Sequence, residues 1–222
     1  MKKILFVLTS HGMLGTTGQT TGYFLSELTH PWHVFTRAGY AVDFVSPLGG
    51  EPPVDGKDMR DESTQAFMAS ADAARAAHSM HPSEVDPRAY AAIFFVGGHG
   101  TMWDFPDHAR LAEITRDVYE QGGVVSAVCH GPAGLLNTTL SDGTYLVAGK
   151  RITSFTDDEE HAKKLDTVVP FLLESALRAR GALFEKSDLW QAHVASHDRV
   201  VTGQNPASAT PLAEEVVRIL ES

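Results

Sequence analysis

The sequence is poor in cysteine and in positive charge, and it has no long hydrophobic run. Cys129 is the single cysteine among 222 residues, so neither a disulfide within the chain nor a cluster of thiolate ligands can form. Lysine and arginine number 18 against 28 acidic residues, and a net charge of −10 does not attract nucleic-acid phosphates or anionic lipids. No apolar run approaches the roughly 18 residues of a membrane span. We therefore expect neither a nucleic-acid nor a membrane partner.

The chain opens on a basic and apolar stretch that imitates a signal peptide. Residues 1–8 are too short for one, and no small-residue cleavage site follows. Hydrophobic residues make up 43% of the sequence and charged residues 21%, which is the balance of a globular protein. We expect a cytoplasmic protein that folds as a single domain over residues 1–222, without repeats or linkers.

Short apolar runs alternate with longer helical patterns along the chain. The predicted strands cover residues 3–8, 41–46, 91–96 and 124–128. A helix is predicted over 107–121, with Leu111, Ile114 and Val118 on one face, and the last helix is predicted to start at Asn205. Continuous apolar strands separated by helices indicate an α/β fold, a doubly wound parallel sheet covered by helices on both faces.

One connection is too long for a simple crossover between strands. Residues 47–90 contain glycine and proline pairs and a helical patch at 64–78. We interpret this segment as a small inserted cap or lid over the functional site. In doubly wound folds that site lies at the carboxyl ends of the strands.

The residues around Cys129 form the clearest functional motif. A predicted strand ends just before it, and the small residues Ala127 and Gly131 stand two positions before and after it. Small residues at these positions let a strand turn sharply into a helix, as at a nucleophile elbow. The positive end of the following helix would lower the pKa of the thiol. We predict that Cys129 is a reactive thiolate; the alternative is a buried structural cysteine.

A glycine-rich turn follows the strand at 91–96. Gly97 and Gly98 precede His99, and Gly100 follows it. Glycines allow backbone N–H groups to approach a substrate oxygen, as an oxyanion hole requires. The spacing matches neither the dinucleotide nor the nucleoside-triphosphate fingerprint, so no nucleotide cofactor is expected. We predict that Gly98, His99 and Gly131 contribute to oxyanion or substrate binding.

Several stretches, in the same order, make the chain resemble the ThiJ/PfpI superfamily, relatives of class I glutamine amidotransferases with a flavodoxin-like core. They are residues 21–27, 30–31, 39–47, 97–104 with Pro106, 127–132, 149–156 and 201–208. More narrowly, the chain resembles the heat-shock chaperone branch known as glutathione-independent glyoxalase III. The resemblance implies a homodimer.

The resemblance also implies four catalytic residues. In that branch the elbow cysteine and the next histidine work with an acidic residue beyond the following strand, and a glutamate of the first helix touches the sulfur. The matching positions are Cys129, His130, Glu160 and Glu27. Four consecutive acidic residues at 157–160 compete for the acidic position, and the register of the motif points to the last. A run of acids also suits the solvated start of any helix.

The surroundings of Glu27 predict its protonation. Its neighbours Phe24, Leu25 and Leu28 indicate a largely buried helix, and a buried glutamate keeps its proton and can donate it to a thiolate or enediolate. No metal is expected, because the pairs His78/His81 and His193/His197 arise easily by chance among 11 histidines. Trp190 gives no signal.

The implied function is a glyoxalase III-type lyase. The thiolate would add to methylglyoxal or a related 2-oxoaldehyde, a proton would move through an enediolate, and water would release lactate. No organic cofactor is needed. The same thiol could reverse early glycation adducts on proteins. Two alternatives remain open: a holdase chaperone for unfolded chains, and a cysteine peptidase or amidase with a Cys-His-Glu triad. The peptidase ranks lower because adjacent Cys129 and His130 need not face each other.

Overall fold

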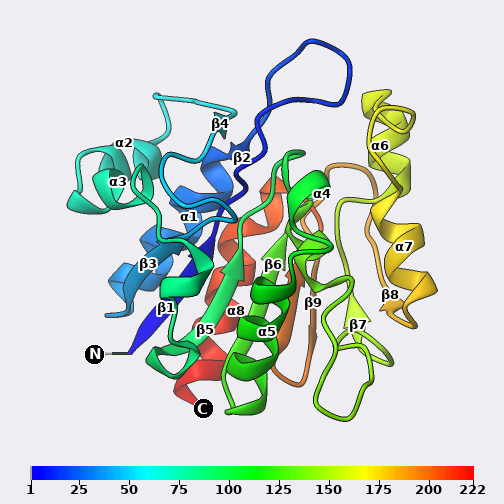
Figure 1. Ribbon diagram of the computed structural model, residues 1–222. Helices are drawn as coiled ribbons and strands as arrows, with labels where there is room; N and C mark the ends of the chain where they lie inside the picture. Colours follow the sequence, from blue (N-terminus) through cyan, green and yellow to red (C-terminus); the bar gives the residue numbers. More distant parts are fainter. Residues whose placement is uncertain (1) are drawn as a thin grey trace.

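A six-stranded sheet forms the centre of the molecule (Figure 1). The computed structural model describes residues 2–222. Across the sheet, the strands are β3 (Ala41–Val45), β1 (Lys3–Val7), β5 (Tyr90–Phe95), β6 (Val124–Val128), β10 (Val200–Gly203) and β9 (Val194–His197). All neighbours pair in parallel except β9, which runs antiparallel to β10. The five parallel strands therefore follow the flavodoxin-like order 2-1-3-4-5, which confirms the predicted fold class.

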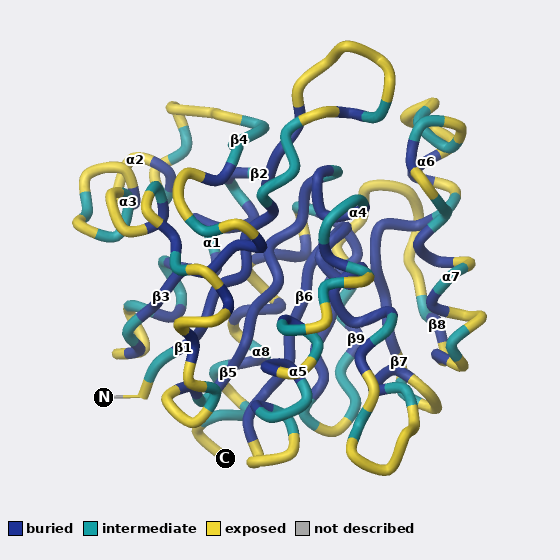
Figure 2. Tube along the Cα trace, viewed as in Figure 1, coloured by how far each residue is buried: buried dark blue, intermediate teal, exposed yellow. Residues whose placement is uncertain are grey.

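Alternation along the strands sends side chains into two separate cores. In β1, Leu5 and Val7 join one hydrophobic cluster while Ile4 and Phe6 join the other, as a sheet buried on both faces requires. Helices α1 (Leu25–Arg37) and α8 (Ala209–Glu221) cover one face, and α5 (Ala109–Glu120) covers the other. Figure 2 shows the buried sheet between these partly exposed helices.

The four strands predicted from the sequence agree with the structure to within one residue at each end. The predicted helix at 107–121 is α5, and its residues Leu111, Ile114 and Val118 are buried. The last helix begins later than predicted, because a 3₁₀ turn over Pro206–Ser208 precedes α8. Strands β9 and β10 escaped prediction because each has four residues, too few to establish a period.

The segment at 47–90 lies beside the sheet. Its helices are α2 (Glu62–Met68) and α3 (Ala71–Ala76), followed by 3₁₀ turns at Pro82–Glu84 and Pro87–Ala89. Figure 1 shows α2 and α3 next to α1 and the edge strand β3. Strand β4 (Val54–Asp55) pairs with β2 (Tyr23–Phe24), directly before α1.

A second peripheral unit lies at the other side of the sheet. It contains α6 (Asp157–Lys163), α7 (Leu173–Ala179), and a two-stranded sheet of β7 (Arg151–Ile152) and β8 (Leu183–Phe184) (Figure 1). The short helix α4 (Thr101–Asp104) follows β5. Within residues 2–222, every helix is too short or too polar to cross a bilayer.

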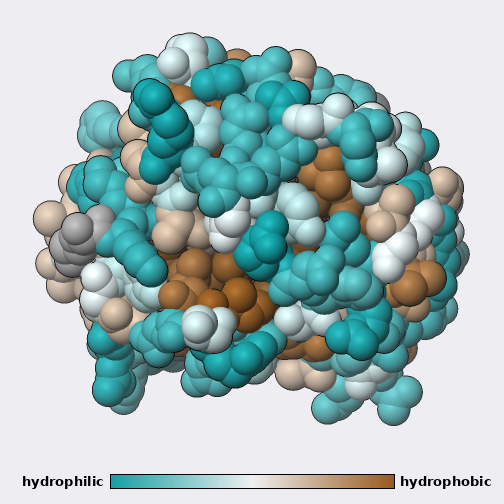
Figure 3. All heavy atoms as spheres, turned by 90° about the horizontal axis from the view of Figure 1, so that it is seen from below, coloured by the Kyte–Doolittle hydropathy of each residue, from teal (hydrophilic) through white to brown (hydrophobic). Residues whose placement is uncertain are grey.

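The amino ends of the central strands carry a hollow lined by both polar and apolar residues. Figure 3, the view from below, shows hydrophobic residues gathered on a largely hydrophilic face. A cavity at this end of the sheet is lined in part by Val124, Ile219 and Leu220. None of the residues predicted to carry chemistry line it.

The two leucines of α8 allow a test of which contacts stabilise the fold. Leu212 is fully buried against the sheet, and Leu212→Ala is expected to lower the free energy of unfolding by about 2–5 kcal/mol, the usual cost of emptying a core position. Leu220 is only partly buried, so Leu220→Ala should cost clearly less. Urea unfolding of both variants measures the difference, and equal losses would contradict the assignment of α8 to the core.

Candidate active site

The site is built on a sharp turn at the end of β6. Cys129 directly follows this strand and has a left-handed backbone, with φ of 59°, a conformation that costs energy for any residue but glycine. A side chain on Gly131 would collide with the carbonyl oxygen of Phe95, so the turn requires glycine there. Gly131 thus shapes the elbow, and it is not among the residues that line the cavity around Cys129.

Three side chains form a hydrogen-bonded line at this elbow. The sulfur of Cys129 lies 3.3 Å from Nδ1 of His130, and Nε2 of His130 lies 2.8 Å from Oε2 of Glu160. Nε2 of His99 lies 2.9 Å from the other oxygen, Oε1 of Glu160. Glu160 belongs to α6 and His99 follows β5, so three segments converge on one carboxylate. The adjacent Cys129 and His130 do face each other, which removes the objection to a triad.

The contacts of Glu160 determine which of the side chains hydrogen-bonded in this line carry a proton. Burial alone would raise the pKa of Glu160, but hydrogen bonds from His130 and His99 outweigh it and lower the pKa to about 2. Since an ionised carboxylate only accepts hydrogen bonds, both Nε2 atoms carry a proton. Burial and the neighbouring His99 lower the pKa of His130 to about 4. His130 is therefore neutral, and its free Nδ1 lone pair points at the sulfur.

Glu27 of α1 faces the sulfur from a second side. Burial raises the pKa of Glu27 to about 8, against the opposing influence of the Cys129 thiol and the Gly97 amide. The side chain is fully buried, and neither carboxyl oxygen has a hydrogen bond of good geometry among residues 2–222. Glu27 thus holds its proton at neutral pH, as its apolar neighbours predict.

The expected low pKa of Cys129 is wrong for the resting site. Burial and the neighbouring Glu27 raise the pKa of the thiol well above its ordinary value, although the His130 amide opposes the rise. The helix that should stabilise a thiolate is a 3₁₀ turn of five residues, Gly131–Leu135, too short for a full macrodipole. The thiol therefore needs a base, and Nδ1 of His130 is in place to accept its proton.

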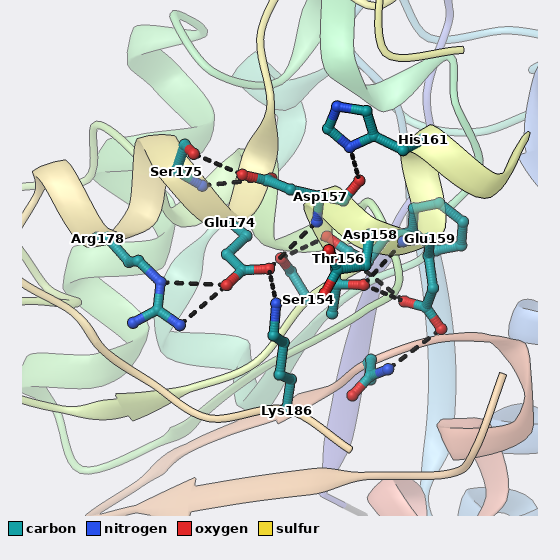
Figure 4. Close-up of polar contacts among 12 residues, drawn as sticks. Ser154, Thr156, Asp157, Asp158, Glu159, His161, Glu174, Ser175, Arg178 and Lys186 are labelled. Atoms are coloured by element: carbon teal, nitrogen blue, oxygen red, sulfur yellow. Dashed lines mark hydrogen bonds and ion pairs between the residues drawn. The ribbon is translucent and has the colours of Figure 1, made fainter. Parts of the chain in front are cut away.

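The other three acidic residues at 157–160 belong to different networks (Figure 4). Asp157 accepts from Ser175, and Asp158 pairs with Lys186 at 2.7 Å. Glu159 is fully buried and binds the start of its own helix, accepting from the amide and hydroxyl of Thr156. Of the four, Glu160 alone contacts His130 among the described residues.

A cavity of about 200 Å³ opens above the sulfur. Glu27, Gly98, His99, Cys129 and His130, all predicted from the sequence, line it. The rest of the lining escaped prediction: Phe24, Asp55, Phe155, Lys163, Trp190 and Pro206. Of the segment predicted as a cap, only Asp55 reaches the cavity. Lys163 of α6 and Trp190, from the loop after β8, also line the cavity.

His99, His130 and Glu160 are the described residues whose ligand atoms cluster closely enough to suggest a metal site. These atoms lie within 4.8 Å of one another. However, each Nε2 atom is 2.8–2.9 Å from a Glu160 oxygen, whereas ligands around a tetrahedral metal lie roughly 3.3 Å apart at metal–nitrogen distances near 2 Å. The three groups hydrogen-bond to each other and would have to separate to admit an ion.

The arrangement supplies the parts of a nucleophilic thiol site. Cys129 offers sulfur, His130 a neutral base held in one tautomer, and Glu27 a protonated acid on the other side of the sulfur. Gly98 places backbone atoms in the cavity wall. Its φ of 110° disfavours any other residue, and a side chain there would collide with the carbonyl oxygen of Gly22. Such a set suits covalent addition of a thiol to a small carbonyl compound followed by proton transfer.

The chain matches a known protein family and is similar to several known proteins over its whole length. Residues 19–219 match the model of the DJ-1/PfpI family. Glyoxalase 3 of Candida albicans is 33% identical, covering 100% of this chain and 99% of its own. Glutathione-independent glyoxalase HSP31 of Saccharomyces cerevisiae is 34% identical with the same coverage. The solved structure of Rapid Encystment Protein 24 kDa from Francisella tularensis has a TM-score of 0.95 at 38% identity, covering 99% of both chains.

The protonated state of Glu27 predicts a pH-dependent stability. Its pKa is about 8 in the folded chain against an ordinary 4.5, so between these values the unfolded chain binds fewer protons and stability falls as pH rises. Glu27→Gln removes this cost. The variant is expected to unfold with a free energy on the order of 4 kcal/mol above wild type at pH 8, and with little gain at pH 4.5.

Urea unfolding at the two pH values measures the effect, and Glu214→Gln, a change at an exposed residue of α8, is the control. A pH dependence that is the same in wild type and Glu27→Gln would show that Glu27 ionises normally.

Proposed function

The chain belongs to the DJ-1/PfpI family, and from this premise we propose that it is a glutathione-independent glyoxalase. It converts methylglyoxal and related 2-oxoaldehydes to 2-hydroxy acids. The observation that carries the proposal is the line from Cys129 through His130 to Glu160 at a small cavity. A cavity of about 200 Å³ accepts a three-carbon compound, and it is below the usual size of pockets for larger ligands.

The first step is addition of sulfur to the aldehyde. Nδ1 of His130 takes the thiol proton, and the sulfur of Cys129 forms a bond to the aldehyde carbon. The resulting alkoxide takes the proton back from His130, which leaves a hemithioacetal and a neutral imidazole. The amide of Gly98, in the cavity wall, is the proposed donor to the oxygen while it carries charge.

The second step moves hydrogen between neighbouring carbons. His130 removes the proton from the former aldehyde carbon, and the electron pair passes to the ketone oxygen as an enediolate. Glu27, which keeps its proton until about pH 8, stabilises this charge as a hydrogen-bond donor. Return of that proton to the second carbon, with transfer of the hydroxyl proton from the former aldehyde carbon to the oxygen of the second carbon, gives a thioester. Water then hydrolyses the thioester to lactate and the free thiol. One carbon is oxidised as its neighbour is reduced, so the balance requires no external electron acceptor.

A cysteine peptidase remains the second candidate, because the Cys-His-Glu line is the arrangement such enzymes use. Two features of the cavity disfavour it. Cys129 is only 4% exposed, and the side chains of Lys163 and Trp190 line the cavity around it. An extended peptide would have to displace both. The same access limits the reversal of glycation adducts to exposed, flexible side chains of partner proteins.

Three further properties extend the proposal. A holdase activity toward unfolded proteins would use exposed apolar side chains such as Leu48 and Met59, and it should survive loss of the sulfur. A homodimer is proposed from the resemblance to the heat-shock branch. A cytoplasmic location is proposed because a catalytic thiol needs a reducing compartment.

The central prediction concerns lactate formation from methylglyoxal without glutathione. Wild type is expected to form lactate, and Cys129→Ser is expected to lose this activity. Glu160→Gln should lower kcat by about 10²–10⁴, because His130 loses the carboxylate that fixes its tautomer and the proton transfers suffer. Asp158→Asn, an exposed neighbour, is the matched control and should stay within about fivefold.

Enzymatic assay of lactate over time provides the measurement. Lactate formation that persists in Cys129→Ser would overturn the sulfur mechanism. A crippling effect of Asp158→Asn, with Glu160→Gln silent, would place the acid elsewhere. Faster turnover of a peptide or amide than of methylglyoxal would favour the second candidate.

A second prediction follows from the pKa values. His130 must be neutral to accept a proton, and its pKa is about 4, so kcat/KM should fall only as pH drops toward 4. Glu27 must be protonated, and its pKa is about 8, so kcat/KM should fall again as pH rises through 8. Glu27→Gln should abolish the alkaline fall. An acid limb near the ordinary histidine value of roughly 6.5 would contradict the proposed state of His130.

A further inference from the structure

The loop between β8 and β9 holds a large aromatic side chain at the mouth of the cavity. Trp190 lines the cavity together with Cys129 and His130, and its exposed fraction of 44% places it at the edge rather than in the core. Its ring centre lies 5.9 Å from that of Phe155, whose own ring centre lies 4.4 Å from that of His130 in a tilted arrangement. The indole is thus the outermost member of a chain of rings that leads to the base.

The backbone at Trp190 is held in an unfavourable conformation. Its φ is 65°, in the left-handed region that bulky residues avoid. Such a conformation persists only where the surroundings determine it, and in proteins it clusters at functional sites. The residue is also outside any helix or strand. Specific contacts must therefore hold the loop in place.

Those contacts converge on a buried carboxylate next to Glu160 in sequence. Oε1 of Glu159 accepts from the amide of Trp190 at 3.1 Å and from the side-chain amides of Gln204 at 3.1 Å and Asn205 at 2.9 Å. Oε2 accepts from Thr156 at the start of α6. Glu159 thereby joins the loop, the end of β10 and the helix that carries Glu160.

The two amide side chains bind the loop a second time. Oε1 of Gln204 accepts from the amide of Ser187 at 2.8 Å, and Nδ2 of Asn205 donates to the carbonyl of Gln191 at 2.8 Å. All three holding side chains are buried. The ring itself has Nζ of Lys163 at 5.8 Å over its face, a cation–π contact that favours one ring orientation.

We propose that Trp190 is the specificity-determining residue of the cavity and that Glu159 is its positioning residue. The indole limits the size of the substituent that a 2-oxoaldehyde can carry beside its carbonyl groups, so small alkyl substituents enter and aryl substituents are rejected. The inference rests on the proposed function. Trp190 takes no part in proton transfer, since the path from Cys129 to Glu160 does not include it.

The first test compares two substrates of the same chemistry and different size. In Trp190→Ala, the ratio of kcat/KM for phenylglyoxal to that for methylglyoxal should rise at least about tenfold, within the range that shape discrimination in apolar pockets supplies. The change should lie mainly in KM for phenylglyoxal. Trp190→Phe should restore most of the wild-type ratio. Leu189→Ala, in the same loop but outside the cavity lining, is the matched control and should leave the ratio unchanged.

A second readout does not depend on the reaction. Cys129 is the only cysteine, so alkylation reports on this cavity alone. The rate with N-phenylmaleimide relative to iodoacetamide should rise at least about tenfold in Trp190→Ala and stay constant in Leu189→Ala. Glu159→Gln should raise both ratios in the same direction by a smaller factor, because it loosens the loop without opening the cavity.

The outcomes separate the two proposals. Ratios within about twofold of wild type in a Trp190→Ala protein with unaltered thermal unfolding would overturn the role of Trp190. If wild type formed no lactate, the proposed function would fail, while the alkylation ratio would still decide the size limit. If Trp190→Ala did not fold, the same comparison in Trp190→Leu would decide it.

Discussion

The left-handed backbone at Cys129 is the constraint on which the site depends. The turn sends the chain from β6 into the following 3₁₀ helix within two residues, and it holds the sulfur above the carboxyl edge of the sheet. This position of the sulfur requires the backbone at the end of β5 to lie very close to the turn. A side chain on Gly97 would collide with the Glu27 carboxyl and the Val128 carbonyl. Only with these approaches intact can Glu27 of α1 face the sulfur, while His99 after β5 and Glu160 of α6 reach the neighbouring His130.

The sequence predicts most of the fold because the parallel sheet is buried on both faces. Such strands are continuous apolar runs, and helix α5 shows a regular apolar stripe. Both can therefore be predicted from the local sequence pattern. The edge strands β9 and β10 cannot, since four residues carry too little periodicity. The length of the segment at 47–90 predicts an insertion, but its position depends on packing against α1 and β3, which local sequence pattern does not encode.

The residues of the candidate site also fall into two groups, those that local motifs predict and those that only the folded chain brings together. The residues that lie within motifs come together in the structure. His130 and Glu27 face the sulfur of Cys129, and Glu160 binds the far side of the His130 ring. The wall residues Asp55, Lys163 and Trp190 come from separate segments and share no spacing, so only the folded chain brings them together. The predicted low pKa of Cys129 is wrong for a related reason, since burial in the folded chain raises it. A local motif indicates the turn and the helix, but not how completely the surrounding side chains exclude water.

Exclusion of water also explains why the Glu160 carboxylate accepts hydrogen bonds from two histidines, His130 and His99. Burial works against the charged form of every titratable group around the sulfur, which leaves Glu27 protonated and His130 neutral. Glu160 is the group that stays ionised in the line, and its side chain is only 5% exposed. A buried carboxylate is tolerated where its oxygens receive hydrogen bonds. His130 satisfies one oxygen and His99 the other. His99 thus keeps Glu160 ionised, and an ionised Glu160 keeps the lone pair of His130 directed at the thiol.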